Sequence, residues 1–197
     1  ATDVLGESLG VCNSRDWSPL DEDWKLPENW QEIIHNGFKE RLDKFRSLRV
    51  FMDICVRCGA CADKCHFFLG TGDPKNMPVV RAELLRSIYR NDFTLAGKLL
   101  KKFAGARELT MDVIREWFIY FFQCSECRRC SVFCPYGIDT AEITMMGREL
   151  LNLLGINTNW VLDPAANCVR TGNHLGIEPH TFKQVVDSLA DDIEEIT

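Results

Sequence analysis

Eight of the ten cysteines occur in two short runs that share one spacing. Both runs follow the pattern C-x2-C-x2-C-x3-C, first as CVRCGACADKC and then as CSECRRCSVFC, with a proline directly after the second run. The eight cysteines are Cys55, Cys58, Cys61, Cys65, Cys124, Cys127, Cys130 and Cys134. Thiolates at this spacing are typical ligands of 4Fe–4S clusters. The sequence therefore predicts two 4Fe–4S clusters as cofactors.

The spacing has a geometric reason. Two-residue gaps let a tight loop place three thiolates around one cluster, whereas the three-residue gap begins a helical turn that directs the fourth cysteine elsewhere. In two-cluster ferredoxins the fourth cysteine ligates the other cluster. We therefore expect crossed ligand sets. Cluster 1 takes Cys55, Cys58, Cys61 and Cys134, and cluster 2 takes Cys124, Cys127, Cys130 and Cys65.

Other uses of these cysteines fit the pattern less well. Structural zinc sites favour two C-x2-C pairs separated by a longer gap, so a third thiolate inside each run is awkward for tetrahedral zinc. Disulfides belong mainly to secreted chains, and no secretory signal opens this sequence. Cys12 and Cys168 stand outside both runs, and Cys168 with His174 would supply only two ligands to a further metal.

Composition narrows the class of protein. The formal net charge of −6 argues against a nucleic-acid partner, which favours a basic surface. The longest apolar block, Trp117–Phe122, is far shorter than the ~20 residues that a membrane span needs. We therefore expect a chain without a membrane span of its own that lies in the cytoplasm.

Helical patterns surround both cysteine runs, and strand patterns are nearly absent. Apolar residues recur at helical spacing from about Pro27 to Arg49, after Pro78, after a cap at Asp92 or Thr94 and up to Gly105, from Thr110 into Cys124, from Asp139 to Gly155, and after Pro179. The expected fold is all-α, a helical ferredoxin-like domain that holds two 4Fe–4S clusters. Residues 31–160 form this domain, residues 1–30 an extended Trp-rich N-terminal segment, and residues 161–197 a C-terminal extension with a helix.

Charged side chains near the cysteines allow two interpretations each. His66 follows Cys65 directly, and it either donates a hydrogen bond to a cluster sulfur or lies at a helix start near solvent. The cationic residues within the runs either offset anionic clusters or form a solvated face. These residues are Arg57, Lys64, Arg128 and Arg129.

The two cysteine runs and the segments next to them resemble a known protein family. Two such runs separated by helices resemble the helical ferredoxin modules of succinate dehydrogenase and heterodisulfide reductase iron–sulfur subunits. The run CHFFLGTGDPKNMPV, Cys65–Val79, is similar to the heterodisulfide-reductase-D-like iron–sulfur subunit of the sulfite-reductase-associated membrane complex, the DsrK type. The run TGNHLGI, Thr171–Ile177, points the same way, and the resemblance covers about Trp30 to Ile177.

The resemblance implies an electron-transfer subunit of a membrane-associated redox complex in dissimilatory sulfur metabolism. Such a subunit passes electrons between a membrane cytochrome b and quinol pool and a disulfide or thiol site. The implied partners are an integral membrane cytochrome b subunit, other subunits of the complex and a small thiol/disulfide carrier protein. The implied location is cytoplasmic and peripheral, on the inner face of the membrane through a partner.

One departure from the family limits what can be carried over. Members of the family continue into a second half with Cys-Cys-Gly motifs, and the present sequence has no Cys-Cys pair. The chain is therefore either an N-terminal piece of a longer protein or a free-standing cluster subunit. No catalytic residue is assigned, and only the ligand role transfers, onto the eight cysteines. A structural iron–sulfur protein or a soluble ferredoxin-like carrier remains the alternative.

Overall fold

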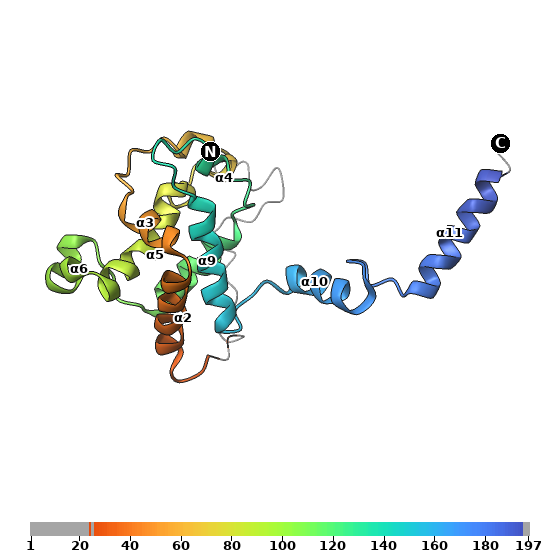
Figure 1. Cartoon of the computed structure of the whole chain (residues 1–197), viewed down its shortest axis with the longest axis horizontal. Helices are drawn as coiled ribbons and strands as arrows, with labels where there is room; N and C mark the ends of the chain where they lie inside the picture. The colour runs from red at the N-terminus through yellow and green to blue at the C-terminus, as the bar shows by residue number, and fades with distance from the viewer. Residues whose placement is uncertain (1–23, 25, 195–197) are drawn as a thin grey trace. The chain divides into compact units, whose positions relative to one another are not determined.

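The computed structural model describes Trp24 and residues 26–194, and all its regular elements are helices (Figure 1). The expectation of a helical chain is confirmed for these residues. The chain divides into two units, residues 1–156 and 157–197. No helix among the described residues is long and apolar enough to span a bilayer.

The first unit carries both cysteine runs. Its α-helices are α2 (Trp30–Lys44), α3 (Arg46–Asp53), α4 (His66–Thr71), α5 (Pro78–Phe93), α6 (Leu95–Leu100), α7 (Met111–Phe122), α8 (Arg129–Val132) and α9 (Thr140–Leu153). Short 3-10 turns connect them at η2 (Ala62–Lys64), η3 (Pro74–Asn76) and η4 (Lys101–Ala104). The second unit consists of α10 (Asn159–Thr171) and α11 (Pro179–Glu194).

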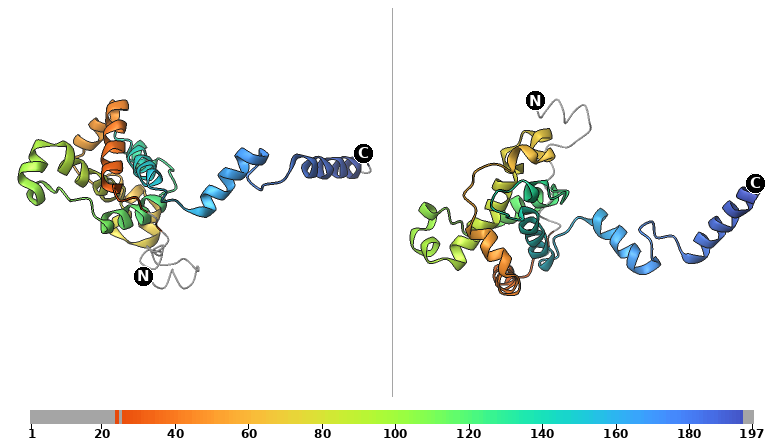
Figure 2. Two further views of the ribbon diagram at one scale, coloured as in Figure 1. Left: turned by 90° about the horizontal axis from the view of Figure 1, so that it is seen from below. Right: turned by 45° about the horizontal axis from the view of Figure 1, so that its top comes forward.

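Helix α9 organises the core of the first unit, because it packs against α7, α2 and α5. Its apolar stripe, which includes Ile143, Met146 and Leu150, is fully buried. Trp117 and Phe121 of α7 are buried against it. Figure 2 shows α9, in teal, beside the orange helix α2, with the green helix α6 projecting from the group. Cys65 is buried, and Cys55 and Cys134 pack against this core, so the core positions both cysteine runs.

Several predicted helix ends are confirmed. The Thr94 hydroxyl accepts a hydrogen bond from the Gly97 amide at the start of α6. The Asp139 carboxylate accepts from the amides of Ala141 and Glu142 at the start of α9. Such caps satisfy donors that the first turn leaves without partners. Gly155 ends this helix segment with a φ of +74°, as a helix-terminating glycine does.

The single helix expected from Pro27 to Arg49 is wrong, since the structure has two helices there. Phe45 lies between α2 and α3 in an extended conformation, with φ −117° and ψ 94°. Leu42 and Leu48 are both buried, at 1% and 2% exposure. In one continuous helix, side chains six residues apart would face different directions. The break lets both leucines reach the core, and it directs α3 toward the first cysteine run.

The sequence analysis predicts no helix between Gly155 and Pro179, and α10 is an additional helix that forms although it contains the helix-breaking residue Pro164. In the Trp-rich N-terminal segment, Trp24 and Trp30 pack against the core of the first unit, and the Trp24 ring lies 5.6 Å from that of Phe118. Residues 1–23 and 25 of that segment lie outside the described residues.

The contact between α7 and α9 yields a stability prediction. A methyl group added at Gly147 would overlap the buried ring of Phe121. We expect Gly147→Ala to destabilise the first unit by about 1–3 kcal/mol, because a well-packed core tolerates added volume poorly. The measurement is anaerobic urea unfolding followed by circular dichroism.

Gly70→Ala in α4 is the matched control. A Cβ at this helical glycine meets no atom within 4 Å. The change should leave stability unaltered or raise it by up to about 1 kcal/mol, because alanine favours the helix. Equal unfolding midpoints for the two variants would contradict the packing described for α7 and α9.

Candidate iron–sulfur site

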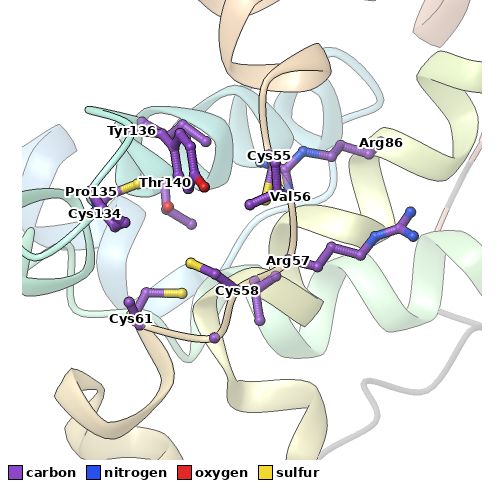
Figure 3. A pocket seen from close by; sticks show the side chains of 14 residues that line it. Cys55, Val56, Arg57, Cys58, Cys61, Arg86, Cys134, Pro135, Tyr136 and Thr140 are labelled. Carbon is purple, nitrogen blue, oxygen red and sulfur yellow. The ribbon is translucent and has the colours of Figure 1, made fainter.

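Two pockets among the described residues of the first unit are each lined by four cysteines. The first pocket has an empty volume of about 360 Å³ and is lined by Cys55, Cys58, Cys61 and Cys134. Figure 3 shows these four side chains arranged around a common space, with Cys134 on a different loop from the other three. The second pocket has an empty volume of about 320 Å³ and is lined by Cys65, Cys124, Cys127 and Cys130.

Each pocket thus takes three cysteines from one run and the fourth from the other. These are the two sets that the spacing predicts, although the role of each set as cluster ligands stays a prediction. Within the described residues, no group of three or more His, Cys, Asp or Glu side chains is close enough to hold a single metal ion.

The two runs share one backbone conformation. Arg57 and Glu126, each two residues after the first cysteine of its run, have φ values of 55° and 54°. Gly59 and Arg128, each one residue after the second cysteine, have φ values of 79° and 58°. A left-handed conformation costs a non-glycine residue about 1–2 kcal/mol. Both loops therefore make the same left-handed turns, which are unfavourable at the three non-glycine residues, and direct three thiols into one pocket.

A helical turn follows in both runs, as the three-residue gap predicts. The 3-10 turn η2 lies between the third and fourth cysteines of the first run, and α8 includes Cys130 of the second run. Ser131 of α8 donates a hydrogen bond to the cap residue Asp139 at 2.5 Å. This bond couples the second cysteine run to the start of the central helix α9.

The segment after Cys65 holds that cysteine in place. The Cys65 thiol is buried and lies 3.6 Å from the Asn76 carbonyl oxygen. The Asn76 side chain donates to the Thr71 hydroxyl, and Asp73 accepts from the Tyr120 hydroxyl at 2.9 Å. The Gly-Thr-Gly-Asp-Pro sequence is therefore a structural support that presents Cys65 to the second pocket.

Burial keeps several of the thiols protonated in the metal-free chain. Burial raises the pKa of Cys130 to about 11, and it raises the pKa of Cys61 and Cys124. Because clusters bind thiolates, loading must release protons and supply positive charge that offsets the burial. Cys61 of the first set also contributes to the raised pKa of Cys130 in the second set. The two sets are therefore electrostatic neighbours.

His66 combines features of both earlier interpretations. It is exposed and begins α4, yet its Nδ1 atom lies 3.9 Å from the Cys127 sulfur, and its Nε2 atom lies 3.3 Å from the Ser125 hydroxyl. It therefore joins the end of the first cysteine run to the loop of the second.

The cationic residues within the runs mostly form ion pairs at the surface. Arg57 pairs with Glu83 at 2.8 Å, and Lys64 pairs with its neighbour Asp63 at 2.8 Å. Arg128 lies 3.5 Å from the Asp139 carboxylate. Surface pairs of this kind contribute little free energy. Arg129 lines the second pocket.

Of the two remaining cysteines, one lies among the described residues, and it lines neither pocket. Cys168 is exposed in the second unit, on α10. Cys12 lies outside the described residues.

Sequence reasoning missed two arginines of α5. Arg81 and Arg86 are each only 2% exposed; Arg81 lines the second pocket and Arg86 the first. A signal was present, because Arg81 lies on the same helical stripe as the buried Leu85 and Ile88. A buried guanidinium beside four thiols fits a group of negative charge. The donor set and its charged surroundings therefore fit 4Fe–4S clusters.

Comparisons with known proteins agree with this chemistry. Residues 51–138 match the family model described as "4Fe-4S dicluster domain". Over these residues the helical fold and its cysteine pockets are thus similar to a 4Fe–4S dicluster domain. No solved structure matches the chain.

Similarity to particular proteins extends over most of the chain. The "Hdr-like menaquinol oxidoreductase iron-sulfur subunit" of Archaeoglobus profundus is 56% identical over 89% of this chain and 32% of the relative. "Hdr-like menaquinol oxidoreductase iron-sulfur subunit 2" of Archaeoglobus fulgidus is 54% identical over 89% of the chain and 32% of the relative.

A more distant match is one subunit of the "Dihydromethanophenazine:CoB--CoM heterodisulfide reductase" of Methanosarcina barkeri, 29% identical over 47% of the chain and 22% of the relative. The heterodisulfide-reductase part of the expected resemblance is confirmed, whereas the DsrK type stays a prediction. The chain spans about a third of the length of the first two relatives.

The crossed arrangement of the pockets predicts the effect of single ligand changes. Cys65→Ser should damage the cluster held by the three cysteines of the second run, although Cys65 belongs to the first run. Cys134→Ser should conversely damage the cluster of the first run. Mössbauer and EPR spectra of anaerobically purified protein measure which cluster changes.

Cys168→Ser is the control, because that cysteine lines neither pocket, and its spectra should match those of the unaltered chain. If each substitution instead perturbs only the cluster of its own run, the ligand sets are not crossed.

Proposed function

We propose that this chain is an electron-transfer subunit that holds two 4Fe–4S clusters in series. When bound, such a cluster supplies reversible one-electron transfer. The observation that carries the proposal is the pair of neighbouring four-cysteine pockets in one packed unit. One cluster would be enough to hold the helices together, whereas two neighbouring clusters form a path.

The proposed path runs between a membrane quinol pool, through an integral cytochrome b subunit, and a disulfide or thiol site. Oxidation of a quinol to a quinone releases two electrons and two protons, and reduction of one disulfide to two thiols consumes the same numbers. The described residues supply no disulfide of their own, so the disulfide belongs to another part of the complex or to a small thiol/disulfide carrier protein. The names of the relatives support the quinol end and the disulfide end of this path, because they include a menaquinol oxidoreductase and a heterodisulfide reductase.

The same relatives support a place in a membrane-associated complex. We propose a cytoplasmic, peripheral position on the inner face of the membrane, and a role in dissimilatory sulfur metabolism as implied by the DsrK-type resemblance. The exposed apolar side chains on α6 and η4 support a docking surface, with Leu99 exposed by 83% and Phe103 by 98%. Large apolar side chains that are exposed close together usually mark a surface that binds a partner.

The central part of the proposal predicts metal content and redox behaviour. Anaerobically purified protein should contain roughly eight iron and eight acid-labile sulfide per chain. An EPR-monitored redox titration should show two reversible one-electron centres. Zinc without labile sulfide would contradict the cofactor, and redox-silent clusters would leave a structural role as the better account.

The partner surface predicts a separable effect on association. The double variant Leu99→Ser and Phe103→Ser should weaken co-purification with an integral cytochrome b subunit from native membranes, while the iron content stays unchanged. Val169→Ser, at a position exposed by 90% in the second unit, is the matched control. Unaltered co-purification of the double variant would exclude α6 and η4 as the docking surface. Absence of the unaltered protein from membranes would favour a soluble carrier.

A further inference from the structure

Two buried arginines of α5 lie beside the two pockets, one for each. Arg86 lines the pocket of Cys55, Cys58, Cys61 and Cys134, and Arg81 lines the pocket of Cys65, Cys124, Cys127 and Cys130. Figure 3 shows the Arg86 side chain reaching toward Cys55, whereas the Arg57 side chain extends away from the sulfur atoms. Arg86 is five positions after Arg81 on the same helix, so one stiff helix presents a guanidinium to each pocket.

Neither guanidinium is paired with a carboxylate among the described residues. Arg86 donates to the Phe51 carbonyl oxygen at 3.0 Å, and its Nε and Nη1 atoms have no partner. Arg81 donates to the Asn76 backbone carbonyl at 3.1 Å and to its side-chain oxygen at 3.3 Å, and the Nε atom has no partner. Arg90 on the same helix differs, because it is ion-paired with Glu83.

A buried guanidinium without a counter-charge is strongly unfavourable. Burial lowers the pKa of Arg86, and thiolates at Cys55, Cys61 and Cys134 raise it. Arg81 in turn lowers the pKa of Cys124 and Cys130. Arg86 lines the pocket of these cysteines, so the negative charge available to it is that of the cysteine set once cluster binding has ionised the thiols. The Glu126 carboxylate also acts on Arg81, but burial raises its pKa, and it lies 3.7 Å from Arg148.

We propose that Arg86 and Arg81 are the fixed counter-charges of clusters 1 and 2, and that each raises the reduction potential of the cluster beside it. The proposal rests on the two-cluster function proposed above. A cluster gains negative charge on reduction, and a nearby fixed cation stabilises that form. Burial makes the interaction strong, because water does not screen it. Arg86 and Arg81 therefore act through the thiolate sets: each guanidinium stabilises the negative charge of the set that it faces.

The common helix has a consequence for electron transfer. Because each pocket receives one buried cation from α5, both potentials are raised together. The two buried cations therefore add no step of their own between the potentials of the two clusters. Removal of one cation would create such a step while leaving all eight cysteines in place.

The test is an EPR-monitored redox titration of the whole chain, purified anaerobically, with Arg86→Gln and Arg81→Gln. Arg86→Gln should lower the potential of cluster 1, so that the ratio of reduced to oxidised cluster 1 falls at least tenfold at fixed ambient potential, about 59 mV for one electron. Cluster 2 should move less. Arg81→Gln should show the reverse. The two EPR signals are assigned with Cys58→Ser and Cys127→Ser, each of which alters one signal.

Two arginines provide controls for charge alone. Arg57→Gln removes an exposed cation at the first pocket, and solvent screening should keep its effect well below that of Arg86→Gln. Arg41→Gln removes a cation paired with Glu149 away from both pockets, and neither potential should move. Equal shifts from Arg86→Gln and Arg57→Gln would overturn the proposal, as would no shift from Arg86→Gln.

A lysine variant separates the effect of the positive charge from the effect of the side-chain shape. Arg86→Lys keeps the positive charge and should hold the cluster 1 potential close to that of the unaltered chain. If Arg86→Gln fails to load cluster 1, loading by Arg86→Lys supports the counter-charge, whereas failure of both variants overturns it. If the unaltered chain lacks two reversible centres, the proposed function fails. If the unaltered chain titrates normally but the variants do not shift, only the present inference fails.

Discussion

The exchange of one cysteine between the two runs is the constraint on which the rest of the structure depends. Each pocket needs three thiols from one loop and a fourth thiol from a loop that is distant in the sequence. The helices between the runs must therefore return the chain so that Cys65 reaches the second loop and Cys134 the first. Three features hold the chain in this arrangement: the contact between α7 and α9, the cap at Asp139 and the hydrogen bond from Ser131.

The support for the pockets is polar as well as apolar. Asn76 is completely buried, and it accepts hydrogen bonds from Arg81 while its carbonyl oxygen lies near the Cys65 thiol. The segment that carries the family resemblance therefore connects a ligand of the second pocket to a buried cation beside it. A motif that narrows the family in sequence thus has a physical role in shaping charge around a thiolate set.

The sequence predicts the local features of this molecule better than the long-range ones. The cysteine spacing and the caps at Thr94 and Asp139 act within a few residues, so they can be read directly from the chain. The break at Phe45 depends on where the core lies relative to Leu42 and Leu48, and helix α10 forms in spite of Pro164. The role of Arg86 could not be predicted from the sequence either, because a single arginine in a helix does not form a recognisable motif.

The measurement that tests the central claim most directly is an anaerobic crystal structure with anomalous scattering at the iron edge. The account predicts two separate groups of four iron atoms. One group should bond to Cys55, Cys58, Cys61 and Cys134, and the other to Cys65, Cys124, Cys127 and Cys130. The account would be contradicted by one cluster bound to all four cysteines of a single run. It would also be contradicted by an anomalous signal at the zinc edge in place of one at the iron edge.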